Sequence, residues 1–142
     1  MTAPKLWIVL ARCHHALMLL VERDIAGLGL CVSDFMVLEA LLHKGPLTIS
    51  EIQSKVLLAS GSMTAAVDRV ESRGLVVRKA QAGDRRARRI ELTPDGRSLI
   101  EGAFRTHAEH LENALAVLQE EEKQQVYDSL KKLGRSVASQ IG

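Results

Sequence analysis

The sequence predicts a mainly α-helical chain with one two-stranded β ribbon, and three observations support this fold class. Apolar residues recur at steps of three and four along most of the chain, which is the spacing of amphipathic helices. Over residues 75–93 the period shortens to two, as in strands. The length of 142 residues fits a single unit, and 46% hydrophobic residues exclude a disordered chain.

A first helix is expected over about residues 4–26. Besides one apolar stripe, it carries a second apolar face with Trp7 and Met18, which is more than one small domain can cover. This surplus predicts a partner chain. The apolar run over residues 6–21 is interrupted by Arg12 and is shorter than the roughly 20 residues of a spanning helix. We therefore expect a cytoplasmic protein without a membrane segment or a signal peptide.

Capping residues define the helices that follow. Ser33 is the expected N-cap of the second helix, and Gly45 and Pro46 are expected to end it. Thr48 and Glu51 form a capping box, in which each side chain accepts a hydrogen bond from a free backbone N–H at the start of a short third helix.

The fourth helix is expected to begin at Ser60 and to end at Gly74, in the left-handed conformation that favours glycine. Its buried stripe is expected to consist of Met63, Ala66, Val67 and Val70. The opposite face carries mostly short and polar side chains, and it consists of Ser62, Thr64, Ala65, Asp68, Arg69 and Ser72.

The region of period two is expected to contain two strands, over residues 75–79 and 89–93, joined by residues 80–88 with a turn at Gly83. Pro94 suits the first position of a long helix. Apolar positions of that helix recur nearly every 3.5 residues, at Ile100, Ala103, His107, Leu111, Ala114 and Leu118. Three glutamates from Glu120 onwards favour the start of a final helix through the helix dipole.

Positive charge is concentrated in one segment. Residues 60–97 hold nine basic and five acidic side chains, whereas the whole chain has a formal net charge of only +2. A helix fits the DNA major groove, where small polar side chains reach base edges. Arginines on a hairpin suit the narrow minor groove or the flanking phosphates. This order of elements predicts a winged helix-turn-helix, with four helices and a two-stranded wing.

The predicted DNA contacts follow from this layout. The fourth helix is expected to place in the major groove Ser62, Thr64, Ala65 and Arg69. Phosphate contacts are expected from Ser60, Arg85 and Arg88. Asp84 is expected to pair with a neighbouring arginine and to orient the wing, because phosphate would repel a carboxylate.

Four segments together resemble the MarR family of bacterial transcription regulators. They are SGSMT at 60–64, VESRGLV at 70–76, DRR at 84–86 and LTPDG at 92–96. The resemblance implies a homodimer on a pseudo-palindromic operator, with residues 1–32 and 98–142 as dimerisation helices and residues 33–97 as the DNA-binding lobe. It also implies that Arg86 enters the minor groove.

Members of this family often are repressors that a small, aromatic and anionic ligand releases from DNA. The resemblance implies a pocket between the dimerisation helices and the DNA-binding lobe. Candidates on the first helix are Trp7, Arg12, His14 and His15. A place in the dimer interface is favoured for these side chains, so no ligand-binding residue is assigned.

Cys13 and Cys31 leave a redox-responsive regulator of the same fold as an alternative. In the hydroperoxide-sensing branch of the family, the position of the reactive cysteine falls at Trp7 here, so that mechanism does not match. Cys13 lies on the apolar stripe, where we expect it to be buried. Two cysteines cannot make a disulfide scaffold and suit a reducing compartment.

No metal site, cofactor or enzymatic activity is expected. His107 and His110 could share a helix face as a ligand pair, but we expect His107 in the dimer seam and His110 in solvent. The sequence carries none of the nucleophile-elbow, zinc-protease, P-loop or dinucleotide motifs. A helical dimerisation adaptor that does not bind DNA is a second alternative, which the basic wing argues against.

Overall fold

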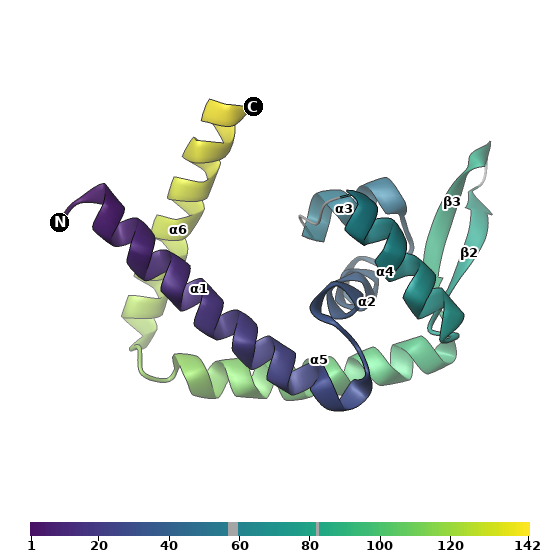
Figure 1. Ribbon diagram of the computed structural model, residues 1–142, viewed down its shortest axis with the longest axis horizontal. Helices are drawn as coiled ribbons and strands as arrows, with labels where there is room; N and C mark the ends of the chain where they lie inside the picture. The colour runs from purple at the N-terminus through teal and green to yellow at the C-terminus, as the bar shows by residue number, and fades with distance from the viewer. Residues whose placement is uncertain (57–59, 82) are drawn as a thin grey trace. The chain divides into compact units, whose positions relative to one another are not determined.

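Figure 1 shows the computed structural model, which describes residues 1–56, 60–81 and 83–142; the side chains of residues 60, 61, 81 and 84–87 lie outside the description. The elements are α1 (Ala3–Ile25), the short 3-10 helix η1 (Ala26–Leu28), α2 (Val32–Lys44), β1 (Leu47–Thr48), α3 (Ile49–Val56), α4 (Ser60–Ser72), β2 (Val76–Gln81), β3 (Asp84–Leu92), α5 (Pro94–Leu115) and α6 (Glu120–Ile141). They form two compact units, Met1–His107 and Ala108–Gly142. The predicted class, mainly helical with a small antiparallel sheet, is confirmed.

Helix α1 agrees with the first predicted helix and leaves most of its surface exposed. Thr2 caps it, because its hydroxyl oxygen accepts a hydrogen bond from the Lys5 N–H at 3.4 Å. Ile25 at its end is buried, whereas Trp7 near its start is 67% exposed. This exposed apolar surface is consistent with the predicted need for a partner chain.

The segment Ala3–Leu28 is long and apolar enough to cross a membrane by length and composition, since its most apolar 18-residue window has a mean hydropathy of 1.3. This differs from the expectation that residues 6–21 are too short, because the helical segment continues to 26 residues. Its most apolar window is 0% buried inside the described chain. An apolar helix that packs against a second subunit has the same composition.

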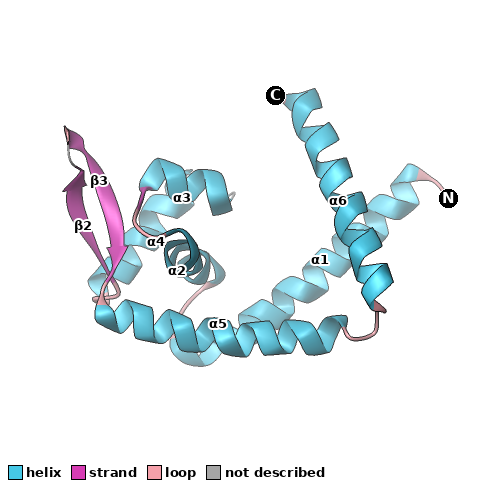
Figure 2. Ribbon diagram, turned by 180° about the vertical axis from the view of Figure 1, so that it is seen from behind, coloured by secondary structure: helices cyan, strands magenta, loops and turns pink. Residues whose placement is uncertain are grey.

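The core of the first unit lies between α2, α3 and α4, which Figure 2 shows grouped beside β2 and β3. Phe35 and Leu38 come from α2, and Ile52 comes from α3. The predicted buried stripe of α4 is confirmed, since four side chains are 0% exposed: Met63, Ala66, Val67 and Val70. Because full burial of such a side chain contributes about 1.5–3 kcal/mol for the larger residues, this stripe fixes which face of α4 points outward.

Helix α2 begins at Val32 with Cys31 as its N-cap, so the prediction of Ser33 as N-cap was wrong. Asp34 supplies the cap instead, since its Oδ2 accepts a hydrogen bond from the Cys31 N–H at 3.3 Å. A carboxylate in the first turn is also favoured by the helix dipole. Gly45 ends the helix as predicted, with a φ of 76°.

The capping box at the start of α3 is confirmed. The Glu51 N–H donates to the Thr48 hydroxyl oxygen at 3.2 Å, and the Thr48 N–H donates to Glu51 Oε1 at 3.1 Å. The bond from the Thr48 backbone, helped by the Thr48 side chain, lowers the pKa of Glu51 below its ordinary value of 4.5.

The stabilisation by this carboxylate should be lost in acid. Because the pKa of Glu51 is lower in the folded chain than in the unfolded chain, its contribution is complete above about pH 4.5 and disappears as the pH falls through the folded value. Glu51→Gln should therefore lower the urea midpoint at neutral pH, and it should lower the midpoint less near pH 3. Glu109→Gln, at an exposed position of α5, is the control. An equal loss for Glu51→Gln at both pH values would contradict this assignment.

The wing sheet contains a third strand that the sequence did not indicate. The strand order is β1-β3-β2, with Leu47 opposite Ile90 and Thr48 opposite Arg89. Arg89 strengthens this pairing by donating from Nη2 to the Pro46 carbonyl at 3.1 Å. Strand β1 has two residues, which are too few to show a period of two.

Strands β2 and β3 are longer than predicted, so the expected connection over residues 80–88 is too long. Their antiparallel pairing is regular to Ala80 opposite Arg88, and after a register shift Gln81 lies opposite Asp84. Gly83 in the turn has a φ of 84°. The four arginines within residues 85–89 therefore lie on β3 and not in a loop.

Thr93 joins the end of α4 to the start of α5. Its hydroxyl donates to the Gly74 carbonyl at 2.6 Å and accepts from the Gly96 N–H at 3.0 Å. Gly74 has the predicted left-handed conformation, with a φ of 74°, and α5 begins at Pro94 as predicted. Gly96 is buried against Leu75, where a Cβ atom would overlap the carbonyl oxygen and lie 2.8 Å from the carbonyl carbon.

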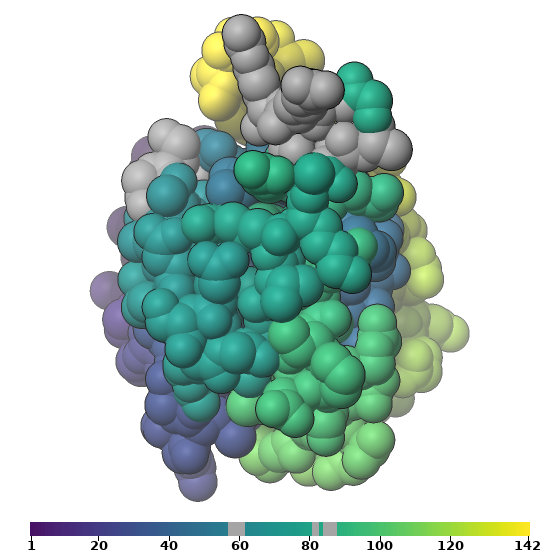
Figure 3. Space-filling model, turned by 90° about the vertical axis from the view of Figure 1, so that its right-hand side faces the viewer, coloured from purple at the N-terminus to yellow at the C-terminus, as the bar shows by residue number. Residues whose placement is uncertain are grey.

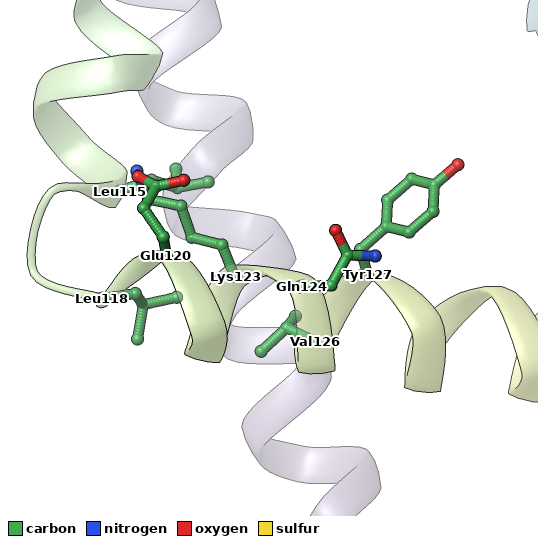
Figure 4. Close-up of a pocket in the computed structure, with 7 residues that line it drawn as sticks. All are labelled: Leu115, Leu118, Glu120, Lys123, Gln124, Val126 and Tyr127. Atoms are coloured by element: carbon green, nitrogen blue, oxygen red, sulfur yellow. The ribbon is translucent and has the colours of Figure 1, made fainter.

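The second unit consists of the end of α5 and α6. Helix α6 begins at Glu120 as predicted, whereas Leu118 lies beyond the end of α5 and not on its stripe. The Lys123 ammonium donates to Glu120 at 3.0 Å, which raises the pKa of Lys123, with Glu112 adding a weaker attraction. A shallow hollow of about 400 Å³ lies here (Figure 4), lined by Leu115, Leu118, Glu120, Lys123, Gln124, Val126 and Tyr127.

Candidate DNA-binding surface

One face of α4 is small, polar and exposed, and Figure 3 shows the side of the molecule on which this part of the chain lies. Three predicted major-groove contacts, Ser62, Thr64 and Ala65, are exposed in the first half of the helix, opposite the buried stripe. An α-helix with its side chains is about 10–12 Å wide and the major groove about 12 Å. Short side chains therefore let the backbone of α4 come close to base edges.

Arg69, the fourth predicted major-groove contact, has other partners. Its Nε donates to Asp34 Oδ1 at 2.9 Å, and its Nη2 donates to the Ser33 hydroxyl at 3.0 Å and lies 3.4 Å from Cys31 Sγ. The Asp34 side chain is 6% exposed, and its hydrogen bond raises the pKa of Arg69. Arg69 thus neutralises a buried carboxylate and joins α4 to α2. The structure differs here from the prediction of a base-reading arginine.

A second cluster of charges joins α4 to β2. Arg78 contacts Asp68 through Nη2 at 2.6 Å and Glu71 through Nη1 at 3.4 Å. Its Nε is buried without a hydrogen-bond partner among the residues that the structure describes. Asp68 lies on the exposed face of α4, and the nearby guanidinium offsets the repulsion that its carboxylate would exert on phosphate.

Several other cations of the basic segment also have partners inside the chain. They are Arg73 (the carbonyls of Leu28 and Gly29), Lys79 (Glu91), Arg89 (the Pro46 carbonyl) and Arg97 (Glu101). Part of the positive charge of residues 60–97 therefore makes contacts within the chain and stabilises its fold. Sequence reasoning missed the carboxylates that pair with these cations, above all Asp34, which pairs with Arg69.

The remaining predicted phosphate and minor-groove contacts lie on the wing, except for Ser60, which begins α4. Arg88 is exposed on β3. The side chains of Ser60, Asp84, Arg85 and Arg86 lie outside the described residues, so their roles stay predictions. The backbone of residues 84–88 belongs to β3, which places these positions on the same ribbon.

Cys13 and Cys31 are both exposed, so the prediction that Cys13 is buried was wrong for the single chain. The Sγ of Cys31 lies 3.2 Å from the Ser33 hydroxyl oxygen. The side chains considered for a ligand pocket are exposed on α1, and none is assigned to a ligand: Trp7, Arg12, His14 and His15.

His107 was expected in a dimer seam but is buried inside the first unit. Its Nδ1 lies 3.2 Å from Asp24 Oδ2, and its ring packs edge-on against Phe35 with 5.3 Å between centroids. One position of the apolar repeat of α5, His107, therefore makes a polar contact with Asp24 near the end of α1. His110 is exposed as expected. Over residues 1–56, 60–81 and 83–142, no three His, Cys, Asp or Glu side chains are placed to hold a metal ion.

Comparisons with known proteins agree with this geometry. A family model described as the MarR family matches residues 30–87. The HTH-type transcriptional regulator MhqR of Bacillus subtilis is 38% identical over 130 residues, which covers 92% of this chain and 90% of that relative.

Two solved structures extend the comparison. A MarR family protein from Bacillus stearothermophilus is 28% identical, with a TM-score of 0.75 and coverage of 95% of this chain and 94% of the other. NadR in complex with 4-hydroxyphenylacetate is 25% identical, with a TM-score of 0.76 and 89% of each chain covered. Proteins of this kind are regulators of transcription and not enzymes. With its exposed α4, its wing and this similarity along nearly its whole length, the chain belongs to the MarR family of winged helix-turn-helix, DNA-binding transcription regulators.

Proposed function

We propose that the protein is a homodimeric repressor that binds a pseudo-palindromic operator in the cytoplasm. The observation that carries this proposal is the small exposed face of α4 beside a wing whose strand β3 carries four arginines within residues 85–89. A two-fold symmetric pair of chains would present two such surfaces to major-groove half-sites about 34–36 Å apart.

The proposed base contacts are made by the first half of α4, through Ser62, Thr64 and Ala65. Arg86 is proposed to enter the minor groove, with Asp84 orienting the wing and with phosphates contacted by Ser60, Arg85 and Arg88. Arg69 is left out of the base contacts, because Asp34 and Ser33 already occupy its guanidinium.

Dimerisation is proposed through residues 1–32 and 98–142. Besides the exposed apolar surface of α1, helix α6 has four apolar side chains at helical spacing that are each 43–44% exposed: Val126, Leu130, Leu133 and Val137. An apolar stripe of this kind requires a covering surface. A second copy of the chain supplies one of matching character.

Release from DNA by a small aromatic anion is the further part of the proposal, supported by the 4-hydroxyphenylacetate in the structure of NadR. Such a ligand acts only if it prefers a form of the dimer that does not fit the operator. Titrating aromatic carboxylic acids into the protein–operator complex should show release by at least one of them. Retention of the operator against the whole series at millimolar concentration would contradict ligand control of this class.

Selection of bound duplexes from a random pool tests the proposed function directly. We expect a two-fold symmetric sequence with a defined half-site spacing, and a dimer in analytical ultracentrifugation. Enrichment of no sequence, or a stable monomer, would contradict the proposal and favour the alternative of a helical adaptor.

Operator affinity should fall steeply with salt, because each neutralised phosphate releases condensed counterions. Ser60 is uncharged, so two cationic phosphate contacts are proposed per chain, Arg85 and Arg88, and the slope of log K against log salt should be roughly −4 for a dimer. Fluorescence anisotropy over a series of salt concentrations measures it. A flat dependence would show that the basic wing does not contact the backbone of DNA.

A further inference from the structure

Two arginines join the second half of α4 to the corner where α1 leads into α2. Arg69 lies in the last turn of α4, and Arg73 directly follows the helix. Residues four apart lie on the same side of a helix. The Arg73 N–H donates to the Arg69 carbonyl at 3.2 Å, so helical geometry continues to this point. Both side chains therefore extend from one side of α4 toward the same corner.

Arg73 holds the backbone of the corner itself. Its Nη2 donates to the Leu28 carbonyl at 3.0 Å, and its Nη1 donates to the Gly29 carbonyl at 3.2 Å. Leu28 is the last residue of η1, which continues α1, and Gly29 ends η1 with a left-handed φ of 68°. A planar guanidinium that bonds two successive carbonyls fixes direction as well as distance.

Arg69 holds the other side of the corner through the first turn of α2. Its bonds to Asp34 and Ser33 connect α4 to the residues that follow the corner, while Arg73 connects α4 to the residues that precede it. Helix α4 is thus attached to the end of α1 by side-chain contacts, independently of the long chain path through α2 and α3.

We propose that Arg73, supported by Arg69, is a positioning residue that fixes the angle between α1 and α4. The inference rests on the proposed function, in which α1 belongs to the dimer interface and α4 enters the major groove. A fixed angle then sets the separation of the two α4 helices, and with it the half-site spacing that the dimer binds. Arg73 acts through the placement of α4 and contacts no base.

The test compares the selected operator with two versions that have one base pair added or removed at the centre. One base pair changes the half-site separation by about 3.4 Å and the relative rotation by about 35°. Wild type should bind the altered operators at least about 30-fold more weakly. Arg73→Ala should bind the original operator within about 5-fold of wild type, yet distinguish the altered ones by less than about 5-fold.

Arg73→Lys is the second variant, because it keeps the charge and most of the stem but cannot bond two carbonyls in one plane. It should lose spacing discrimination with an unchanged salt slope. Arg97→Ala removes an exposed cation that pairs with Glu101, and it should discriminate as wild type does. Retention of wild-type discrimination by either Arg73 variant overturns the proposal. Failure of wild type to bind any two-fold symmetric duplex would instead refute the proposed function.

Discussion

Gly96→Ala should destabilise the protein by about 3 kcal/mol or more and lower its melting temperature by roughly 10 °C. The added Cβ would overlap the Leu75 carbonyl oxygen, which is backbone and has no rotamer through which to move away. That carbonyl also accepts the Thr93 N–H at 3.0 Å, so a shift of Leu75 would break the hydrogen bonds at the start of α5. Chemical and thermal unfolding followed by circular dichroism measure the loss.

Gly102→Ala is the matched control, because Gly102 lies on the same helix with nothing within 4 Å of a Cβ atom. Alanine is favoured over glycine inside a helix by about 1 kcal/mol, so this change should leave stability equal or slightly higher. Equal destabilisation by the two substitutions would show that the contact with Leu75 does not determine the effect at Gly96.

Arg86→Ala should weaken operator binding at least about 100-fold while the protein stays dimeric. If each chain places one arginine in the minor groove, a loss of about 1–3 kcal/mol is counted twice in the dimer. A tenfold change in affinity corresponds to about 1.4 kcal/mol. Two losses of about 1.4 kcal/mol or more therefore weaken binding by the dimer at least about 100-fold. Anisotropy titration measures affinity, and sedimentation measures the oligomeric state.

Arg105→Ala serves as the control, since it removes one positive charge from an exposed position of α5 that lies outside the proposed DNA-binding lobe of residues 33–97. It should change affinity by less than about 3-fold, as expected for a distant charge screened by salt. If Arg86→Ala had no larger effect than this control, the wing would not be part of the DNA-binding surface.

The local signals that define elements could be interpreted reliably from the sequence. The Thr48–Glu51 capping box, the left-handed glycines and Pro94 each act within a few residues, so sequence alone locates them. The cap of α2 was misplaced because cysteine is not a preferred N-cap, and Asp34 three residues later makes the bond. Strand β1 was missed because its stability comes from Ile90 and Arg89, which are distant in sequence.

The candidate site was likewise predictable where it depends on local sequence, and it was not predictable where it depends on tertiary packing. The exposure of Ser62, Thr64 and Ala65 follows from the period of α4, which is a local property. The partner of Arg69 is 35 residues away in the chain, and only the packing of α2 on α4 brings Asp34 to it. His107 likewise meets Asp24 through tertiary packing, so a repeat that counts it among apolar positions cannot show the contact.

The four residues between α2 and α3 leave no room for a change in length. Gly45 caps α2, the Pro46 carbonyl receives Arg89, Leu47 is buried and paired in the sheet, and Thr48 caps α3. An inserted residue would displace at least one of these four from its partner. The length of this connection should therefore not vary among natural relatives, and engineered tags or insertions should not be placed in it.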